Sequence, residues 1–89
     1  MGFEWDSDKA ARNLKKHGID FAYAARVFLD PYRLDKEEDS EDYLEDRYQT
    51  IGIVEDWLLT AVYTYRDQNI RLISARRSTP NERRIYHEF

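Results

Sequence analysis

Five arginines lie within fourteen residues near the C-terminal end of the sequence. They are Arg71, Arg76, Arg77, Arg83 and Arg84. An arginine keeps its positive charge at physiological pH, and its planar guanidinium donates two parallel hydrogen bonds to one phosphate. This concentration predicts a corner that engages nucleic-acid phosphates. The alternative is that these arginines pair with nearby carboxylates and only solubilise the surface.

The strand pattern over residues 70–77 predicts where these arginines point. Alternate side chains of a strand share one face, so Ile70 and Leu72 are expected to face the N-terminal helices. The same pattern predicts an open face that carries Arg71, Ile73, Ala75 and Arg77. Arg76 is expected beside the N-terminus of the next helix, where free N–H groups favour an anion.

A second basic cluster lies at the end of the first predicted helix. It comprises Arg12, Lys15, Lys16 and His17. Basic groups at this end complement the helix dipole, which favours a structural role. Lys16 is still a candidate for a phosphate contact, and the His17 imidazole can move a proton near pH 7. His87 is interpreted as a surface residue.

The charge is distributed very unevenly along the chain. The formal net charge is −4, with +1 on residues 1–34, −8 on residues 35–56 and +3 on residues 57–89. The acidic stretch 35–46 lacks the glycine and ligand spacing of an EF-hand calcium loop. It is predicted to be a mobile, solvated loop that contacts a basic partner segment or screens the arginine corner.

Length and composition indicate one small domain, residues 1–89, of which 42% are hydrophobic and 15% aromatic. The absence of cysteine fits a reduced cytoplasm and excludes a cysteine-based zinc site. With only two distant histidines, we expect neither a metal nor a cofactor. No apolar run is long enough for a bilayer, and no secretion signal is present, so a membrane role is not expected.

The N-terminal third predicts one strand and two helices. Residues 3–5 alternate like a strand, Asp6 caps a first helix, and Gly18 ends it. Asp20 caps a second helix with an apolar face, which stops before Pro31.

Four strands and a helix follow in the pattern. The strands are predicted at residues 32–34, 48–54, 57–65 and 70–75. Thr79, Pro80 and Glu82 fit a capping box with proline at the first helical position. The predicted class is α+β, with two N-terminal helices and a C-terminal helix packed on a mainly antiparallel sheet of four to five strands.

Several short motifs follow one another along almost the whole chain. They are Phe3-Glu4-Trp5-Asp6, Lys9-Ala10, Asn13-Leu14, Lys16-His17-Gly18-Ile19, Phe21, Ala25, Val27-Phe28-Leu29-Asp30-Pro31, Arg47, Ile51-Gly52, Ile70 to Arg77, Glu82-Arg83 and Tyr86. In this order they resemble the BrnT toxins of bacterial type II toxin–antitoxin systems.

The resemblance implies a fold similar to the RelE and ParE toxins, ribonuclease activity and inhibition of translation. It also implies neutralisation by a BrnA-like ribbon-helix-helix antitoxin. The pair is expected to form a heterotetramer that contacts operator DNA only through the antitoxin.

Metal-free RNA cleavage needs a base, an acid and a stabiliser of the phosphorane that forms when the 2′-hydroxyl attacks. Arg71 and Arg76 are predicted to be the stabilisers, and Glu82, Tyr86 and His17 are the candidates for proton transfer. Further RNA-backbone contacts are predicted for Lys16, Arg77, Arg83 and Arg84.

Two other functions fit the same residues. The arginine corner could bind an antitoxin or DNA without breaking a bond. The chain could also inhibit gyrase, as ParE-like relatives do.

Overall fold

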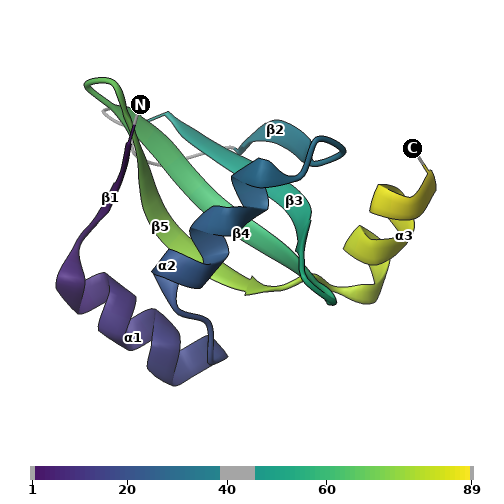
Figure 1. Ribbon diagram of the computed structural model, residues 1–89, viewed down its shortest axis with the longest axis horizontal. Helices are drawn as coiled ribbons and strands as arrows, with labels where there is room; N and C mark the ends of the chain where they lie inside the picture. Colours follow the sequence, from purple (N-terminus) through teal and green to yellow (C-terminus); the bar gives the residue numbers. More distant parts are fainter. Residues whose placement is uncertain (1, 39–45, 89) are drawn as a thin grey trace.

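The computed structural model describes residues 2–38 and 46–88 and has the predicted α+β class (Figure 1). Its elements are β1 (Phe3–Trp5), α1 (Ser7–His17), α2 (Phe21–Ala24), the 3₁₀ helix η1 (Ala25–Leu29), β2 (Leu34–Glu38), β3 (Arg47–Val54), β4 (Trp57–Arg66), β5 (Asn69–Arg77) and α3 (Pro80–Glu88). The strands form one sheet in the order β1-β5-β4-β3-β2.

Strands β2 to β5 form an antiparallel meander, and β1 pairs in parallel with β5. The predicted hairpin turn at Glu55-Asp56 is confirmed, and Glu55 has a positive φ of 56°. Asp67 in the next turn has a φ of 57°. The two tight turns keep β3, β4 and β5 next to one another, as two-residue hairpin loops do.

One face of the sheet is covered by α1, α2 and η1, and we call it the helical face (Figure 1). Phe21, Ala24 and Val27 pack there against Leu59 and Leu72 in the buried core. Leu72 thus faces the N-terminal helices as predicted, as does Ile70. The opposite face, which these elements leave uncovered, is called the open face below.

The N-terminal helix begins and ends at the predicted residues. The Lys9 N–H donates to the Asp6 carboxylate at 3.0 Å, and Gly18 ends α1 with a φ of 71°. The second helix differs from the prediction, because α2 has four residues and continues as the 3₁₀ helix η1. A 3₁₀ segment winds more tightly than an α-helix and is common at a helix end.

Gly52 explains how closely η1 approaches the sheet. A Cβ at this position would lie 2.6 Å from Cγ2 of Val27 and 3.2 Å from the Val27 carbonyl oxygen. Because only glycine leaves this space, η1 can rest directly on β3.

The acidic stretch 35–46 was predicted to be a loop, and for residues 35–38 this prediction is wrong. Leu34–Glu38 form β2, the edge strand of the sheet, whereas residues 39–45 lie outside the described residues. Edge strands tolerate charge because one side of the strand borders solvent. The strand predicted at residues 32–34 also begins later, since Tyr32 lies in a turn.

The predicted faces of β5 are correct only up to Leu72. The register against β4 shifts there, with Leu72 opposite Tyr63 and Ser74 opposite Val62, which leaves Ile73 without a partner. A one-residue bulge reverses the alternation, so Ala75 is buried in the core and Arg77 lies on the helical face. Their predicted placement on the open face is therefore wrong, whereas Arg76 takes a place on that face.

The side chain of Asn13 makes the backbone hydrogen bonds that a neighbouring strand would make at the edge of β5. Its side-chain amide donates to the Ala75 carbonyl at 2.9 Å and accepts from the Ala75 N–H at 3.0 Å. Strand β1 pairs only with residues 70–72 of β5, so this amide satisfies the backbone beyond the end of β1. The two bonds hold α1 against the bulged part of β5.

We predict that Asn13→Ala lowers the free energy of unfolding by about 2–4 kcal/mol, because both buried backbone groups of Ala75 lose their partner. Urea denaturation followed by circular dichroism measures this difference. Asn81→Ala, at an exposed position on α3, is the control and should change stability by at most about 0.5 kcal/mol. Equal urea midpoints for the two variants would contradict this role of Asn13.

Candidate functional site

Among the residues that the structure describes, Arg76 and Glu82 form a close ion pair on the open face. The Arg76 Nη1 and Nη2 groups donate to the two Glu82 carboxylate oxygens at 2.7 and 3.0 Å. The side chain of Glu82 is 14% exposed and that of Arg76 35%. This bidentate geometry fixes the plane of the guanidinium between β5 and the first turn of α3.

The capping box predicted at the start of α3 is confirmed and takes part in the same network. The Thr79 N–H donates to Glu82 Oε1 at 2.8 Å, and the Glu82 N–H donates to the Thr79 hydroxyl at 3.1 Å. The Thr60 hydroxyl of β4 donates to Glu82 Oε1 at 3.1 Å. The anion beside this helix N-terminus is therefore the Glu82 carboxylate.

These contacts change the ionisation of both partners. Partial burial alone would raise the pKa of Glu82, but the hydrogen bonds from Arg76 and the Thr79 N–H lower it to about 2. The hydrogen bond to Glu82 in turn raises the pKa of Arg76. Glu82 is thus a weak base whose oxygens are already engaged, which suits a residue that positions Arg76.

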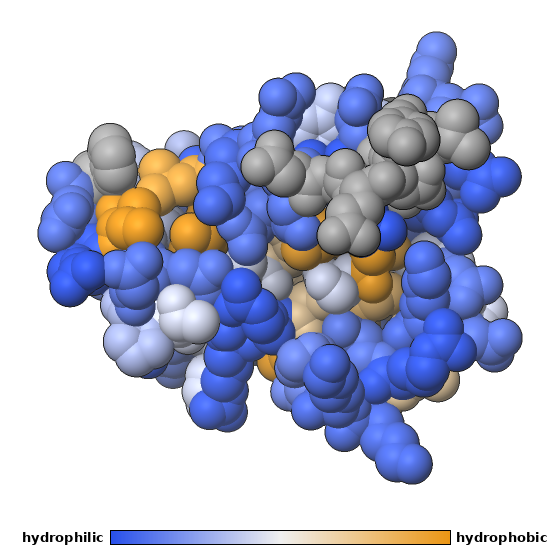
Figure 2. Space-filling model, turned by 180° about the vertical axis from the view of Figure 1, so that it is seen from behind, coloured by the Kyte–Doolittle hydropathy of each residue, from blue (hydrophilic) through white to orange (hydrophobic). Residues whose placement is uncertain are grey.

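A groove of about 410 Å³ borders Arg76 on the open face. It is lined by Lys36, Glu37, Glu38, Gln49, Val62 and Arg76. A second hollow of about 440 Å³ shares Lys36 and Gln49 with it and extends to Glu82 and Ile85 of α3. Figure 2 shows this side, with hydrophilic side chains over most of the coloured surface and hydrophobic ones toward α3 and in the middle of the face. We call the first hollow the Arg76 groove.

The basic cluster of α1 lines a third hollow, of about 360 Å³, which we call the α1 groove. Its lining residues are Lys9, Arg12, Asn13, Lys16, His17, Ile73 and Ser74. Ser74 lies opposite Val62, which lines the Arg76 groove. The two grooves therefore flank the same part of β5, and Lys16 and His17 lie on the α1 side of it.

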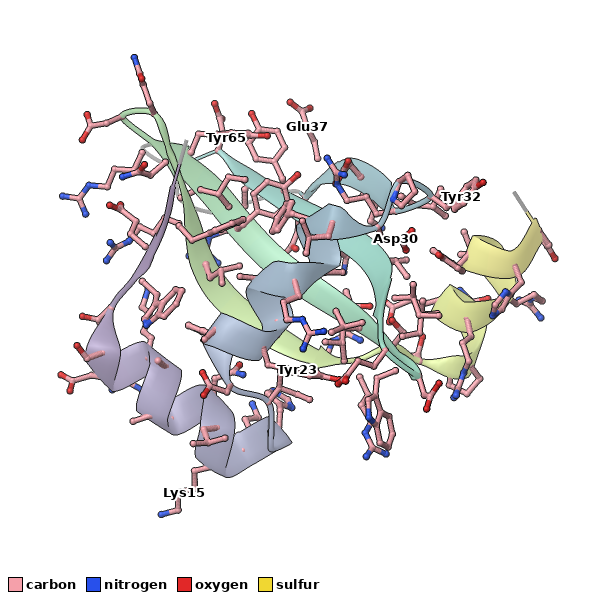
Figure 3. The ribbon with its side chains drawn as sticks, viewed as in Figure 1. Lys15, Tyr23, Asp30, Tyr32, Glu37 and Tyr65 are labelled. Atoms are coloured by element: carbon pink, nitrogen blue, oxygen red, sulfur yellow. The ribbon has the colours of Figure 1, made fainter. Side chains whose placement is uncertain are left out.

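Tyr86 lies apart from both grooves. Its hydroxyl donates to Asp30 Oδ2 at 2.6 Å, and the same oxygen accepts the Ile53 N–H at 2.8 Å. Asp30 is buried at the end of η1, facing β3 and α3 (Figure 3). Burial and the bond to Asp30 raise the pKa of Tyr86 to about 12, so the phenol stays neutral and anchors α3.

The five C-terminal arginines do not converge on one corner, so that prediction is wrong. Arg71 pairs with Glu4 at 3.4 Å near β1, and Arg77 stacks over the Trp57 ring at 3.9 Å. Arg84 donates to Asn81 on α3. Arg83 is exposed on the same helix. The partners of Arg71 and Arg77 lie on other strands, far away in the sequence, so the pattern around these arginines could not predict them. Arg84, in contrast, pairs within its own helix.

Sequence reasoning missed the five residues that line the Arg76 groove together with Arg76: Lys36, Glu37, Glu38, Gln49 and Val62. Lys36 and Glu38 belong to the stretch that was interpreted as a loop. After Leu34, residues 35–38 are all charged, so the segment lacks the apolar face that usually signals a strand. Their position follows only from pairing with β3.

The described residues contain neither a group of side chains suited to a metal ion nor a helix suited to a membrane. Within residues 2–38 and 46–88, no three His, Cys, Asp or Glu side chains are grouped so that they could hold a metal ion. No helix in this described part is long and apolar enough to cross a membrane.

Comparison with known protein families gives a match over most of the chain. Residues 5–82 match the family model described as "Ribonuclease toxin, BrnT, of type II toxin-antitoxin system". The matched range includes both grooves and the Arg76–Glu82 pair. No curated protein matches the chain.

We predict that the Arg76–Glu82 pair loses its contribution to stability in acid. A pKa lowered from 4.5 to about 2 stabilises the fold above pH 4.5, by up to about 3 kcal/mol, and this stabilisation disappears as the pH falls toward 2. Solvent screening at the partly exposed Arg76 reduces the value. A double-mutant cycle of Arg76→Ala and Glu82→Gln, measured by urea unfolding at several pH values, gives the coupling. A coupling that is unchanged between pH 7 and pH 2 would contradict this assignment.

Proposed function

Because the chain belongs to the BrnT family of ribonuclease toxins of type II toxin–antitoxin systems, we propose that it cleaves RNA in the Arg76 groove without a metal. The observation that carries this proposal is the orientation of Arg76. Its guanidinium is held by Glu82 at the wall of a groove that is large enough for a nucleotide segment. A fixed cation of this kind is suited to a reaction that builds negative charge on phosphorus.

Arg76 keeps hydrogen-bonding capacity for a phosphate. A guanidinium has five N–H donors, of which three point to Glu82 and to the Arg77 carbonyl. The remaining donors, on the Nε side, have no partner among the described residues. They offer the two parallel donors that match a phosphate. Because Glu82 fixes the guanidinium in advance, little reorganisation is needed when the phosphorane forms.

We propose that the RNA crosses β5 from the α1 groove to the Arg76 groove. Lys16 and His17 would contact its phosphates or move a proton on one side, and Arg76 and Lys36 would contact them on the other. The positive charges at both ends would hold the backbone and leave the scissile phosphate near Ser74 and Arg76.

The other predicted site residues take different roles in this proposal. Glu82 and Tyr86 position Arg76 and α3 through the bonds described above, rather than transferring protons. Arg71 lies on the open face, where it pairs with Glu4 of β1, and it lines neither groove. Arg83 and Arg84 would contact flanking phosphates from α3. Arg77, on the helical face, is placed outside the path.

A type II toxin family implies an antitoxin partner. We propose that this partner is a BrnA-like ribbon-helix-helix protein, that the two form a heterotetramer, and that DNA is contacted only through it. We further propose that the free toxin acts in the cytoplasm and stops translation by cleaving RNA. Expression in bacteria with and without the neighbouring gene tests this. Arrest of DNA replication with continued translation would favour gyrase inhibition instead.

We predict that Arg76→Lys slows RNA cleavage by roughly a hundredfold to a thousandfold, the range expected when a transition-state donor is lost. Lysine keeps the positive charge beside Glu82 but loses the planar fork. Single-turnover cleavage of a model RNA by the purified variants measures the effect. Circular dichroism confirms that each variant is folded.

Arg26→Lys is the matched control for this experiment. Arg26 lies near Tyr23 and Glu55 on the helical face, so the same substitution should leave the rate within about twofold of wild type. If Arg76→Lys also cleaves within about threefold of wild type, Arg76 does not stabilise the transition state.

We predict that cleavage persists in EDTA, because Arg76 and Lys36 supply the positive charge that a metal would otherwise provide. The same single-turnover assay with and without the chelator measures this. Loss of activity that Mg²⁺ or Mn²⁺ restores would refute the metal-free mechanism.

A further inference from the structure

Glu38 is the last described residue of β2, and it lines the Arg76 groove. In the register of the sheet it lies opposite Arg47 of β3. Lys36 precedes it by two residues and therefore shares its face of the strand. Glu38 thus brings a carboxylate to the open face, into the groove that holds Arg76.

The carboxylate of Glu38 is unusual because its Oε2 atom is buried and makes no hydrogen bond with the described residues. A buried polar atom without a partner normally destabilises the fold, since it has lost water and gained nothing. Such an atom in a groove is available to accept a hydrogen bond from a ligand. A ribose 2′-hydroxyl is a donor of this kind.

Three basic side chains and one further carboxylate surround Glu38 in the sheet and the groove. Lys36 on β2, Arg47 on β3 and Arg76 on β5 are basic, and Glu37 is the other carboxylate that lines the groove. The negative charge of Glu38 also contributes to the raised pKa of Arg76, which places the two groups within electrostatic range. None of the three basic side chains ordinarily titrates between pH 4 and 8.

We propose that Glu38 is the general base of this ribonuclease and acts opposite Arg76 in the same groove. The inference rests on the proposed function. The Glu38 carboxylate takes the proton of the 2′-hydroxyl as its oxygen forms a bond to the adjacent phosphorus. The bond from phosphorus to the 5′-oxygen breaks, and this oxygen takes a proton from solvent. The products are a 2′,3′-cyclic phosphate and a 5′-hydroxyl end. Arg76 stabilises the negative charge of the phosphorane that forms between the substrate and these products.

Glu38 fits this role better than Glu82, although both carboxylates lie near Arg76. Both oxygens of Glu82 accept hydrogen bonds within the protein, from Arg76, Thr79 and Thr60. A proton acceptor needs a free lone pair that faces the substrate. Oε2 of Glu38 has a free lone pair, because it accepts no hydrogen bond from the described residues, and the Glu38 side chain lines the groove.

The test compares Glu38→Gln with Glu88→Gln. Glu88 carries the same charge at an exposed position at the end of α3, and it lines neither groove. Both proteins are assayed under single turnover with a model RNA and with its 2′-deoxy analogue. Glu38→Gln should cleave the RNA about 10²–10⁴-fold more slowly, and Glu88→Gln within about twofold of wild type. The deoxy analogue should stay intact.

The pH profile and the product ends separate a base from a structural residue. The wild-type rate should rise with pH and then level off, as for a reaction with a general base, and Glu38→Gln should lose this rise. Removal of an unpaired buried charge should leave the urea midpoint unchanged or raise it. Product analysis by mass spectrometry should find the cyclic phosphate.

Each outcome decides the proposal. If wild type does not cleave RNA, the proposed function fails and the role of Glu38 fails with it. If wild type cleaves but Glu38→Gln keeps its rate within about threefold and its pH profile, another group is the base and the ribonuclease assignment stands. If Glu38→Gln loses activity together with a lower urea midpoint and an unchanged pH profile, Glu38 is structural.

Discussion

The ion pair between Arg76 and Glu82 is the interaction on which the open face depends. Helix α3 has no fully buried residue, so apolar burial alone does not hold it against the sheet. The pair joins the end of β5 to the first turn of α3, and the Tyr86–Asp30 bond joins its second half to η1. One carboxylate thus caps a helix, fixes that helix to the sheet and orients the guanidinium of the groove.

The helical face of the sheet supplies the hydrophobic core, and the open face carries the charged groups of the candidate site. The helical face is closed by aromatic and aliphatic side chains, with Phe28 packed edge-on against Tyr63 and Tyr63 stacked on Tyr48. Asn13 extends this closed side past the end of β1 by satisfying the backbone of Ala75. Because this side supplies the core, the open face can carry charged groups whose pairing is incomplete, which a small domain could not tolerate inside its core.

Local signals in the sequence predicted most elements, because caps and hairpins depend on neighbouring residues. Asp6, Gly18 and the Thr79–Glu82 box act within one or two turns of chain, and the structure confirms them. The faces of β5 beyond Leu72 were predicted wrongly, since one bulged residue reverses every later side chain. Glu38 was missed because its strand is recognised only through pairing with β3. The family was recognised from motif order, which does not require these details.

The distribution of charge explains how a chain with a net charge of −4 can present a surface for RNA. Counterion release and phosphate pairing depend on the basic groups within reach of the backbone, and the Debye length of about 8–10 Å screens more distant charges. Lys9, Arg12 and Lys16 collect at the α1 groove, and Lys36 and Arg76 at the next groove. In the proposed function, Glu38 takes part in the reaction, and the other carboxylates of β2 disfavour phosphates that lie beside the path. In the same proposal, the basic groups of α1, β2 and β5 and the acidic groups of β2 together favour a defined position of the RNA over tight nonspecific binding.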